Sequence, residues 1–382
     1  MATTKNFLPE QYKKNNKLGI NHNYLNQQFS DHEIIWTKMR EVIKRGDFTL
    51  GSEVDLLEEE YAHASGTNHA VGVGSGTDAI FLSLKALGVG EGDEVVTTPF
   101  TFYATIGAIV TAGAKPVFCD IGADYNIDPL KIESKITPAT KAIVPVHWSG
   151  KPCDMDVVEE IAKKYSLPIV GDACHAISAS YKGRTAGSLG TLACFSFHPL
   201  KNLNVWGDGG IITTNSDELA DKLRKMRNHG LVGRDECHFF AYNSRLDTIQ
   251  AVVARHMLKK INFITESRVA HAEYFDRELS SISQITIPKR DKHIYQVYHI
   301  YSICCQQRNE LQNYLIENGI DAKVHYPIPM HLQKAANYLG YKKGDFPIAE
   351  RIADSTISLP VHEFISYDQQ DHVIKLIKDF YD

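Results

Sequence analysis

Between residues 70 and 215, short apolar runs with the character of strands alternate with stretches of helical spacing. The strand-like runs lie at residues 70–73, 93–98, 114–120, 142–147, 167–170 and 211–214. Strands that alternate with helices favour a parallel sheet that is covered on both faces, because each crossover helix packs on the sheet. The sequence therefore predicts an α/β fold built around a mostly parallel sheet.

The pattern changes after residue 214. The sequence predicts an amphipathic helix over 217–228, a polar loop over 233–247 and a long helix from residue 248 to about residue 275. From about residue 285 onward, strand-like runs such as 295–305 alternate with helices such as 308–318. This second pattern is typical of a compact α+β domain.

The length of the chain indicates more than one domain. With 382 residues, it is too long for one compact core. We predict an N-terminal segment and a large α/β domain over 1–250, followed by a connecting helix and a smaller C-terminal α+β domain over 251–382.

Composition argues against several classes of protein. The net charge is −5 and no basic block stands out, so a nucleic-acid partner is not expected. The seven cysteines show no CxxC spacing and the 17 histidines form no HExxH motif, so no metal is expected. Residues 1–17 are polar and no apolar run approaches the roughly 20 residues of a membrane span. We therefore expect a cytoplasmic protein with no membrane association.

Two residues near the centre of the chain, Asp172 and Lys201, suggest the chemistry. Asp172 follows the apolar run at 167–170, and α/β enzymes keep functional groups at the carboxyl ends of strands. Lys201 lies amid small and aromatic residues, where partial desolvation would lower its pKa and make its amine a nucleophile. Pyridoxal phosphate needs such a lysine to hold its aldehyde as a Schiff base and an acid to keep its pyridine nitrogen protonated. The alternatives are a solvated lysine and an aspartate that caps a helix.

A glycine-rich turn before residue 77 offers an anion site. The amides of Gly76 and Thr77 would face inward at the N-terminus of a helix predicted over 77–87, where a phosphate binds well. The alternative is a tight turn with nothing bound. Thr77 stands where GxGxxG has its last glycine, and GxxxxGK[ST] is absent from the sequence, which weakens a dinucleotide or nucleoside triphosphate assignment.

These residues together resemble the DegT/DnrJ/StrS family of pyridoxal-phosphate sugar aminotransferases, which have the PLP-dependent transferase fold type I of aspartate aminotransferase. The likeness covers residues 21 to 373, approximately, and consists of short motifs in a fixed order. The motifs are GSGTDA (74–79), GDEV (92–95), TF (101–102), GAKPVF (113–118), PVH (145–147), DA (172–173), SF (196–197), KN (201–202), GDGG (207–210), RNHG (227–230), YN (242–243) and HYP (325–327). The resemblance implies a large sheet domain flanked by helices and a smaller C-terminal domain.

The resemblance also implies how the matched residues would meet the cofactor ring. Lys201 is similar to the lysine that carries the cofactor and then moves protons, and Asp172 is similar to the partner of the pyridinium nitrogen. Phe102 stands at the ring-stacking position, although a buried phenylalanine is more often core. His175 stands where many members have a glutamine near the pyridine hydroxyl, and a histidine can also donate a hydrogen bond there.

Other matched residues imply how the phosphate would be held. Gly76 and Thr77, together with the hydroxyl of Ser196, resemble the phosphate-binding cup of the family. Asn243 resembles an asparagine that reaches the phosphate of the neighbouring subunit's cofactor. That last role implies a homodimer with shared active sites.

The reaction that the resemblance implies is amino transfer from an amino acid, with L-glutamate as the expected donor, to a keto group of a nucleotide-linked sugar. Candidates for contact with the sugar are His325, Tyr326, His331 and Trp148, and the alternative for each is a structural loop residue. A PLP-binding sugar dehydratase would be expected to replace Lys201. The pattern is also compatible with a non-catalytic regulatory homologue. A nicotinamide oxidoreductase would fit the parallel sheet, but the glycine loop argues against it.

Overall fold

The computed structural model describes residues 18–22 and 24–382. Residues 1–17, for which no signal peptide is expected, lie outside the described residues. The elements of the first two thirds of the chain are α1 (Leu25–Gln28), α2 (His32–Arg45), α3 (Ser52–Ser65), β1 (His69–Val73), α4 (Gly76–Ala86), β2 (Glu94–Thr97), α5 (Tyr103–Thr111), β3 (Lys115–Phe118), α6 (Pro129–Ile132), β4 (Thr140–Ile143), α7 (Met155–Tyr165), β5 (Val170–Asp172), β6 (Ser180–Tyr181), β7 (Arg184–Thr185), β8 (Leu192–Ser196), β9 (Gly210–Thr214) and α8 (Asp217–Met226).

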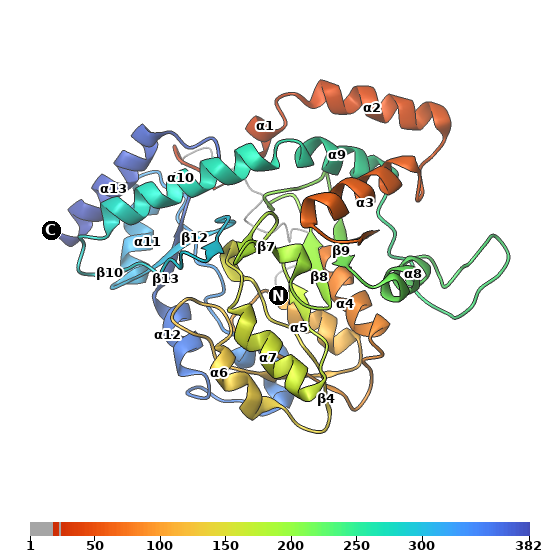
Figure 1. Cartoon of the computed structure of the whole chain (residues 1–382). Helices are drawn as coiled ribbons and strands as arrows, with labels where there is room; N and C mark the ends of the chain where they lie inside the picture. Colours follow the sequence, from red (N-terminus) through yellow and green to blue (C-terminus); the bar gives the residue numbers. More distant parts are fainter. Residues whose placement is uncertain (1–17, 23) are drawn as a thin grey trace, which may run out of the picture.

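The last third begins with two consecutive helices. Its elements are α9 (Thr248–Leu258), α10 (Ile261–Leu279), β10 (Ile285–Thr286), β11 (Ile294–Tyr295), β12 (Tyr301–Cys305), α11 (Arg308–Glu317), α12 (Pro347–Ser355), β13 (Thr356–Leu359) and α13 (Tyr367–Tyr381). Helix α9 begins before residue 250, so the predicted domain boundary falls inside its first turn. Figure 1 shows α9 and α10 following one another from the large sheet toward the C-terminal elements.

The large sheet is mostly parallel, as predicted. Its strands form the sets β3-β2-β4 and β1-β9-β8-β5, which parallel bridges from Ile143 to Ile169 and from Val146 to Asp172 join at β4 and β5. Strand β9 is antiparallel to both β8 and β1, whereas β2, β3 and β4 are parallel to one another and β5 is parallel to β8. Strand β9 therefore runs against the direction that the other strands of this sheet share.

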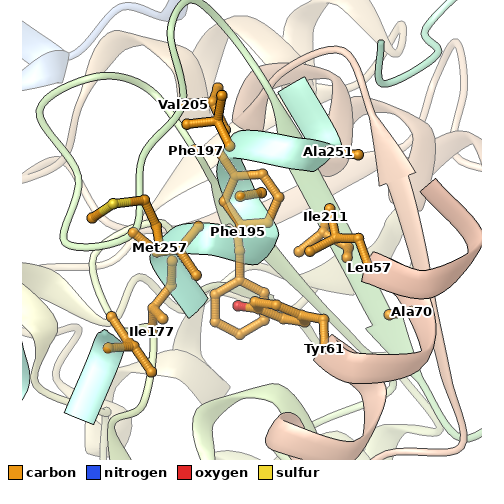
Figure 2. Close-up of a cluster of buried hydrophobic side chains, with 14 of the residues drawn as sticks. Leu57, Tyr61, Ala70, Ile177, Phe195, Phe197, Val205, Ile211, Ala251 and Met257 are labelled. Carbon is orange, nitrogen blue, oxygen red and sulfur yellow. The ribbon is translucent and has the colours of Figure 1, made fainter. Parts of the chain in front are cut away.

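Helices cover both faces of this sheet. Alternate residues of a strand point to opposite faces, so neighbouring residues of β8 belong to different core clusters. On β8, Phe195 packs in one core cluster with Leu57 and Tyr61 of α3. Its neighbour Cys194 packs in another with Ile80 of α4. Figure 2 shows the first cluster, in which Tyr61 lies against Phe195 between the sheet and helix α3.

The C-terminal elements form a smaller antiparallel sheet in the order β10-β12-β13. The strand-like run predicted over 295–305 is divided here. Ile294–Tyr295 pairs with β6 next to the large sheet, whereas Tyr301–Cys305 belongs to the smaller sheet. Tyr298 between them has a φ of 45°, which no strand contains, so one continuous strand was the wrong prediction.

The long helix predicted from residue 248 to about 275 is also divided. Helix α9 ends at Leu258 and α10 begins at Ile261, with Lys259 and Lys260 between them. The ammonium of Lys260 pairs with Asp31 at 2.7 Å, beside the start of α2. The two helices therefore follow one another with two lysines between them instead of forming one continuous helix.

Candidate active site

The carboxyl end of β5 places Asp172 in the protein interior, where it is 6% exposed. Its carboxylate accepts hydrogen bonds from the Thr105 hydroxyl at 2.7 Å and from the backbone N–H of Cys174 at 3.2 Å. Thr105 also contacts the hydroxyl of Thr101 at 2.8 Å. A carboxylate can accept more than two hydrogen bonds, so Asp172 could also accept one from a protonated partner.

Lys201 lies on the connection between β8 and β9. The two strands are hydrogen-bonded to each other where this connection begins and ends. Ser196 and Gly210 are paired where the two strands meet the connection. The N–H of Phe197 donates to the carbonyl of Gly209 at 2.8 Å, which extends the pairing by one residue. Because β9 returns antiparallel to β8, both ends of the lysine-bearing loop are fixed on the same edge of the sheet.

The side chain of Lys201 is half-buried. Burial lowers the pKa of Lys201, while the neighbouring Cys174 and Asp172 act in the opposite direction. Burial likewise raises the pKa of the Cys174 thiol well above its usual range, so Cys174 stays uncharged. A larger share of Lys201 is therefore a neutral amine than is the case for a surface lysine.

The N-terminus of α4 forms a close cradle against β8. An ideal Cβ on Gly76 would lie 2.6 Å from the Cβ of Ser196, so only a glycine fits there without displacement. Ser75 caps the helix through a hydrogen bond from the Asp78 N–H at 3.0 Å. The first amides of a helix have no partner within it, so the Gly76 and Thr77 amides can serve an anion.

Several rings surround Lys201, and burial keeps their histidines uncharged. His175 and His299 stack with their ring centroids 4.4 Å apart, and burial and the charge of Lys201 both lower their pKa values well below 6.5. Burial lowers the pKa of His325 to about 3, and its Nδ1 lies 2.8 Å from the hydroxyl of Ser358. The positive charge of Lys201 contributes to this shift as well, so His325 also lies near the amine.

Phe102 and Tyr326 form an aromatic edge of the same site. Phe102 immediately precedes α5 and is 49% exposed, so one face of its ring is accessible. Its ring centroid lies 6.2 Å from that of Tyr326. Burial raises the pKa of Tyr326, and the charge of Asp172 adds to the shift, which places the phenol near the carboxylate.

Trp148 and His331 lie deeper than the other sugar-contact candidates. Trp148 is 1% exposed and packs against Phe100, with ring centroids 5.2 Å apart. Its indole N–H is buried without a hydrogen-bond partner among the described residues. His331 has a buried side chain that contacts Phe346, and its Nε2 lies 3.0 Å from a carboxylate oxygen of Glu350. The structure thus brings His325 near Lys201 and Tyr326 near Asp172, and it places Trp148 and His331 in the surrounding core.

Asn243 lies apart from these residues on the surface. It is exposed and forms a bridge with Asn228, at the base of the long loop that projects after α8 (Figure 1). The next residue, Ser244, contacts the strand that leads to the cradle, because its hydroxyl accepts from the Gly74 N–H at 3.1 Å. Asn243 therefore faces outward from its own chain.

Three contacts of the site were not predicted from the sequence. They are the Thr105 and Cys174 donors to Asp172 and the stacking of His299 on His175. Thr101 and Thr105 are four residues apart, a spacing that puts both hydroxyls on one side of a helix turn and was available in the sequence. His299 comes from a distant part of the chain, and no local pattern signals its approach.

Two negative observations apply to residues 18–22 and 24–382 only. No group of three or more His, Cys, Asp or Glu side chains there is arranged to hold a metal ion. None of the helices in that part of the chain combines the length and apolar character needed to cross a bilayer.

Curated relatives are similar over most of the chain. A "Pleiotropic regulatory protein" of Geobacillus stearothermophilus is 45% identical over 344 residues, which are 89% of this chain and 92% of the relative. A dTDP-3-amino-3,4,6-trideoxy-alpha-D-glucose transaminase of Streptomyces venezuelae is 38% identical over 340 residues, which are 89% of this chain and 90% of the relative.

Solved structures show the same fold. S. venezuelae DesV, crystallised with a ketimine intermediate, superposes with a TM-score of 0.92 at 36% identity, covering 94% of this chain and 97% of that one. The PLP form of the putative sugar aminotransferase Spr1654 of Streptococcus pneumoniae has a TM-score of 0.86 at 28% identity, covering 91% and 95%. The sequence profile of the DegT/DnrJ/EryC1/StrS aminotransferase family matches residues 30–378. The chain belongs to this family of aminotransferases, whose fold it shares.

Proposed function

We propose that this protein is a pyridoxal-phosphate-dependent aminotransferase that moves an amino group from L-glutamate to a keto group of a nucleotide-linked sugar. The observation that carries the proposal is the desolvated amine of Lys201 beside the buried carboxylate of Asp172. Transaminases of dTDP-linked sugars among the relatives support the substrate class.

The residues present fit this cofactor. The amides of Gly76 and Thr77 and the hydroxyl of Ser196 would hold its phosphate, in a cradle too close for any larger side chain. Asp172 would pair with the ring nitrogen, and the accessible face of Phe102 would stack on the ring.

Ring binding also involves His175 and Lys201. His175 would donate a hydrogen bond to the ring hydroxyl, and Lys201 would hold the aldehyde. When bound, pyridoxal phosphate supplies an electrophilic carbon and an electron sink.

Lys201 moves the protons of the reaction. Its neutral amine removes a proton from the α-carbon of the amino acid, and the resulting ammonium later returns a proton to the carbon of the sugar that receives the amino group. A lowered pKa suits both steps, because the amine must accept and release a proton near neutral pH. When the cofactor is bound, Asp172 would accept a hydrogen bond from its protonated ring nitrogen.

We assign sugar contacts to His325, which lies near Lys201, and to Tyr326, which lies near Asp172. Trp148 and His331 would act on the sugar pocket through the packing of its wall, since both side chains are buried. The division at residue 250 also stays part of this proposal, with the cofactor held mainly by the large domain. A cytoplasmic location agrees with seven cysteines that form no disulfide, as is typical of a reducing compartment.

Replacing Gly76 with alanine should weaken cofactor binding about 10- to 100-fold, because overpacking costs about 1–3 kcal/mol and the new methyl would press on Ser196. Equilibrium dialysis of the apoenzyme against pyridoxal phosphate measures the change. Gly107→Ala is the matched control, because nothing lies within 4 Å of an added Cβ there. Equal affinity of the two variants would remove the Gly76 cradle from the proposal.

We also propose a homodimer in which Asn243 completes the active site of the partner. Lys201→Ala and Asn243→Ala dimers, each of low activity, should recover about a quarter of wild-type activity when unfolded together and refolded, because half of the dimers then contain one intact site. Mixing Lys201→Ala with Asp172→Asn should give no recovery, since both changes affect the site of their own chain. Recovery in neither mixture would exclude a shared site.

A regulatory role is the second candidate, and the name of the Geobacillus relative favours it. The two functions differ in turnover. Glutamate should change the visible absorption of the cofactor-loaded aminotransferase, and a panel of nucleotide-linked keto-sugars with ¹⁵N-glutamate should yield a labelled amino sugar. An unchanged spectrum and no labelled product would favour regulation. A dehydratase is less compatible, because Lys201 is retained.

A further inference from the structure

We propose that His299 and Asn202 form a positioning pair for Lys201, and that the contacts around this pair fix the stacked rings of His299 and His175 in opposite tautomers. The inference rests on the proposed function, because it assigns the pair to the reaction that Lys201 carries. It concerns protons on two ring nitrogens, so it can be tested without turnover.

The orientation of Asn202 follows from its neighbours. Asn202 is buried directly after Lys201, and its side-chain nitrogen donates to the carbonyl of Val297 at 3.1 Å. A carbonyl only accepts, so the amide nitrogen must face it and the amide oxygen must point the other way. That oxygen lies 3.3 Å from Nδ1 of His299. Because an amide oxygen also only accepts, the proton of His299 must be on Nδ1.

The same reasoning gives the other tautomer for His175. The backbone N–H of Ser149 donates to Nδ1 of His175 at 3.3 Å. A backbone N–H cannot accept, so Nδ1 of the neutral ring carries no proton and Nε2 does. Ser149 has a φ of 57°, and its hydroxyl accepts from the side-chain nitrogen of Gln296 at 3.0 Å. Gln296 thus helps to hold the turn that sets this tautomer.

Both rings stay neutral where they meet. They stack with centroids 4.4 Å apart and planes inclined by 40°, and each ring contributes to a buried environment that excludes the charged form. In the neutral state, Nε2 of His175 carries a proton and can donate, whereas Nε2 of His299 carries a lone pair and can only accept. Opposite tautomers in one stack give the site a hydrogen-bond donor for the cofactor without a second positive charge beside Lys201.

One segment, residues 296–299, makes every one of these contacts except the hydrogen bond from Ser149 to His175. Its Val297 N–H donates to the carbonyl of Gly150 at 3.1 Å, and the guanidinium of Arg268 donates to the carbonyl of Tyr298 at 3.2 Å. The segment therefore ties α10 to the turn beside His175 and to the residue beside Lys201. A misplacement of a catalytic group by about 1 Å can cost about 10²-fold in rate, so this anchorage matters to Lys201. His299 acts through Asn202 and is a positioning residue.

The first experiment uses the unmodified apoenzyme. Nitrogen-15 NMR of histidine-labelled protein distinguishes protonated from bare ring nitrogens, and His175→Gln and His299→Phe spectra assign the two residues. We expect the proton on Nε2 of His175 and on Nδ1 of His299. A proton on Nε2 of His299, or a charged ring at neutral pH, would overturn the proposal, and this result does not depend on the activity of any variant.

The second experiment measures the effect on Lys201. His299→Phe keeps a stacking ring and loses the N–H, whereas His299→Asn keeps a donor near the Nδ1 position. We expect His299→Phe to lower kcat about 10- to 100-fold with a small change in KM. It should also slow the borohydride trapping of free pyridoxal on Lys201 in the apoenzyme. His299→Asn should have a kcat and a trapping rate between those of His299→Phe and the wild type. His293→Phe, an exposed histidine six residues earlier, is the matched control.

The outcomes separate this inference from the proposed function. If folded His299→Phe trapped pyridoxal and turned over at wild-type rates, His299 would have no positioning role. Lys201 would still be the lysine that binds the cofactor. Trapping on a different lysine in the wild-type protein would instead end the proposed function, whatever the tautomers are. Equal losses in His299→Phe and His299→Asn would show that a donor near the Nδ1 position gives no benefit and would also contradict the pair.

Discussion

Replacing Lys201 with alanine will abolish amino transfer in both directions, with a loss of at least about 10⁴-fold in kcat, the upper range for one positioned acid-base group. The reason is that the same amine removes the proton from the amino acid and returns it to the sugar carbon. Lys201 is the one lysine in the loop between Ser196 and Gly210, so no other residue of this loop can take over its role. Stopped-flow absorption measures each half-reaction separately, with glutamate or with the amino sugar.

Lys182→Ala is the control for this experiment. Lys182 is an exposed lysine that pairs with Asp156 at the surface, so its loss should leave both half-reactions within about twofold of wild type. Borohydride treatment of the wild-type holoenzyme, followed by digestion, should label the peptide that contains Lys201. Turnover by Lys201→Ala near the wild-type rate, or a label on another peptide, would refute the assignment.

Asp172→Asn should lower kcat/KM about 10³-fold, which corresponds to about 4 kcal/mol of transition-state stabilisation. The amide keeps the size of the carboxylate and can still accept from Thr105, but it loses the negative charge that holds a proton on the ring nitrogen. Thr105→Val should have a smaller effect of about 10-fold, because it removes one hydrogen bond and leaves the charge. Steady-state kinetics of the two variants, saturated with cofactor, measure the difference.

Asp120→Asn provides a matched comparison. Asp120 is also buried and also follows a strand of the large sheet, but its carboxylate accepts from the backbone N–H groups of Ile348 and Ala349. Asp120→Asn should reduce thermal stability and leave kcat/KM within about threefold of the wild-type value, since Asp120 contacts neither Lys201 nor Asp172. If both aspartates gave the same loss of activity, burial rather than position would explain the effect of Asp172.

The sequence predicted the elements that depend on local pattern. The alternation between residues 70 and 215 predicted the mostly parallel sheet, and strand ends placed Asp172 correctly at the carboxyl end of β5. Its proximity to Lys201 followed from the resemblance to the family rather than from spacing. Local pattern cannot report that residues 172 and 201, which follow different strands, come near each other.

Tertiary contacts decided the parts that the sequence did not predict. Residues 295–305 look like one strand because their apolar character is continuous, yet Tyr298 turns the chain between two sheets. Trp148 was a candidate sugar contact, and only its packing against Phe100 shows that it is buried. Exposure of a single side chain depends on which distant element covers it, and this information is not local.

The reversal of β9 has a consequence for the order of events during catalysis. The paired strands β8 and β9 fix both ends of the loop that carries Lys201. We therefore expect the backbone of this loop to have the same position before and after cofactor or substrate binds. Displacing the ends of this loop would break the pairing of Ser196 with Gly210 and the hydrogen bond from Phe197 to Gly209. Adjustment to sugars of different size must therefore come from the opposite wall, where the C-terminal portion supplies His325 and Tyr326, while the chemical centre remains stationary.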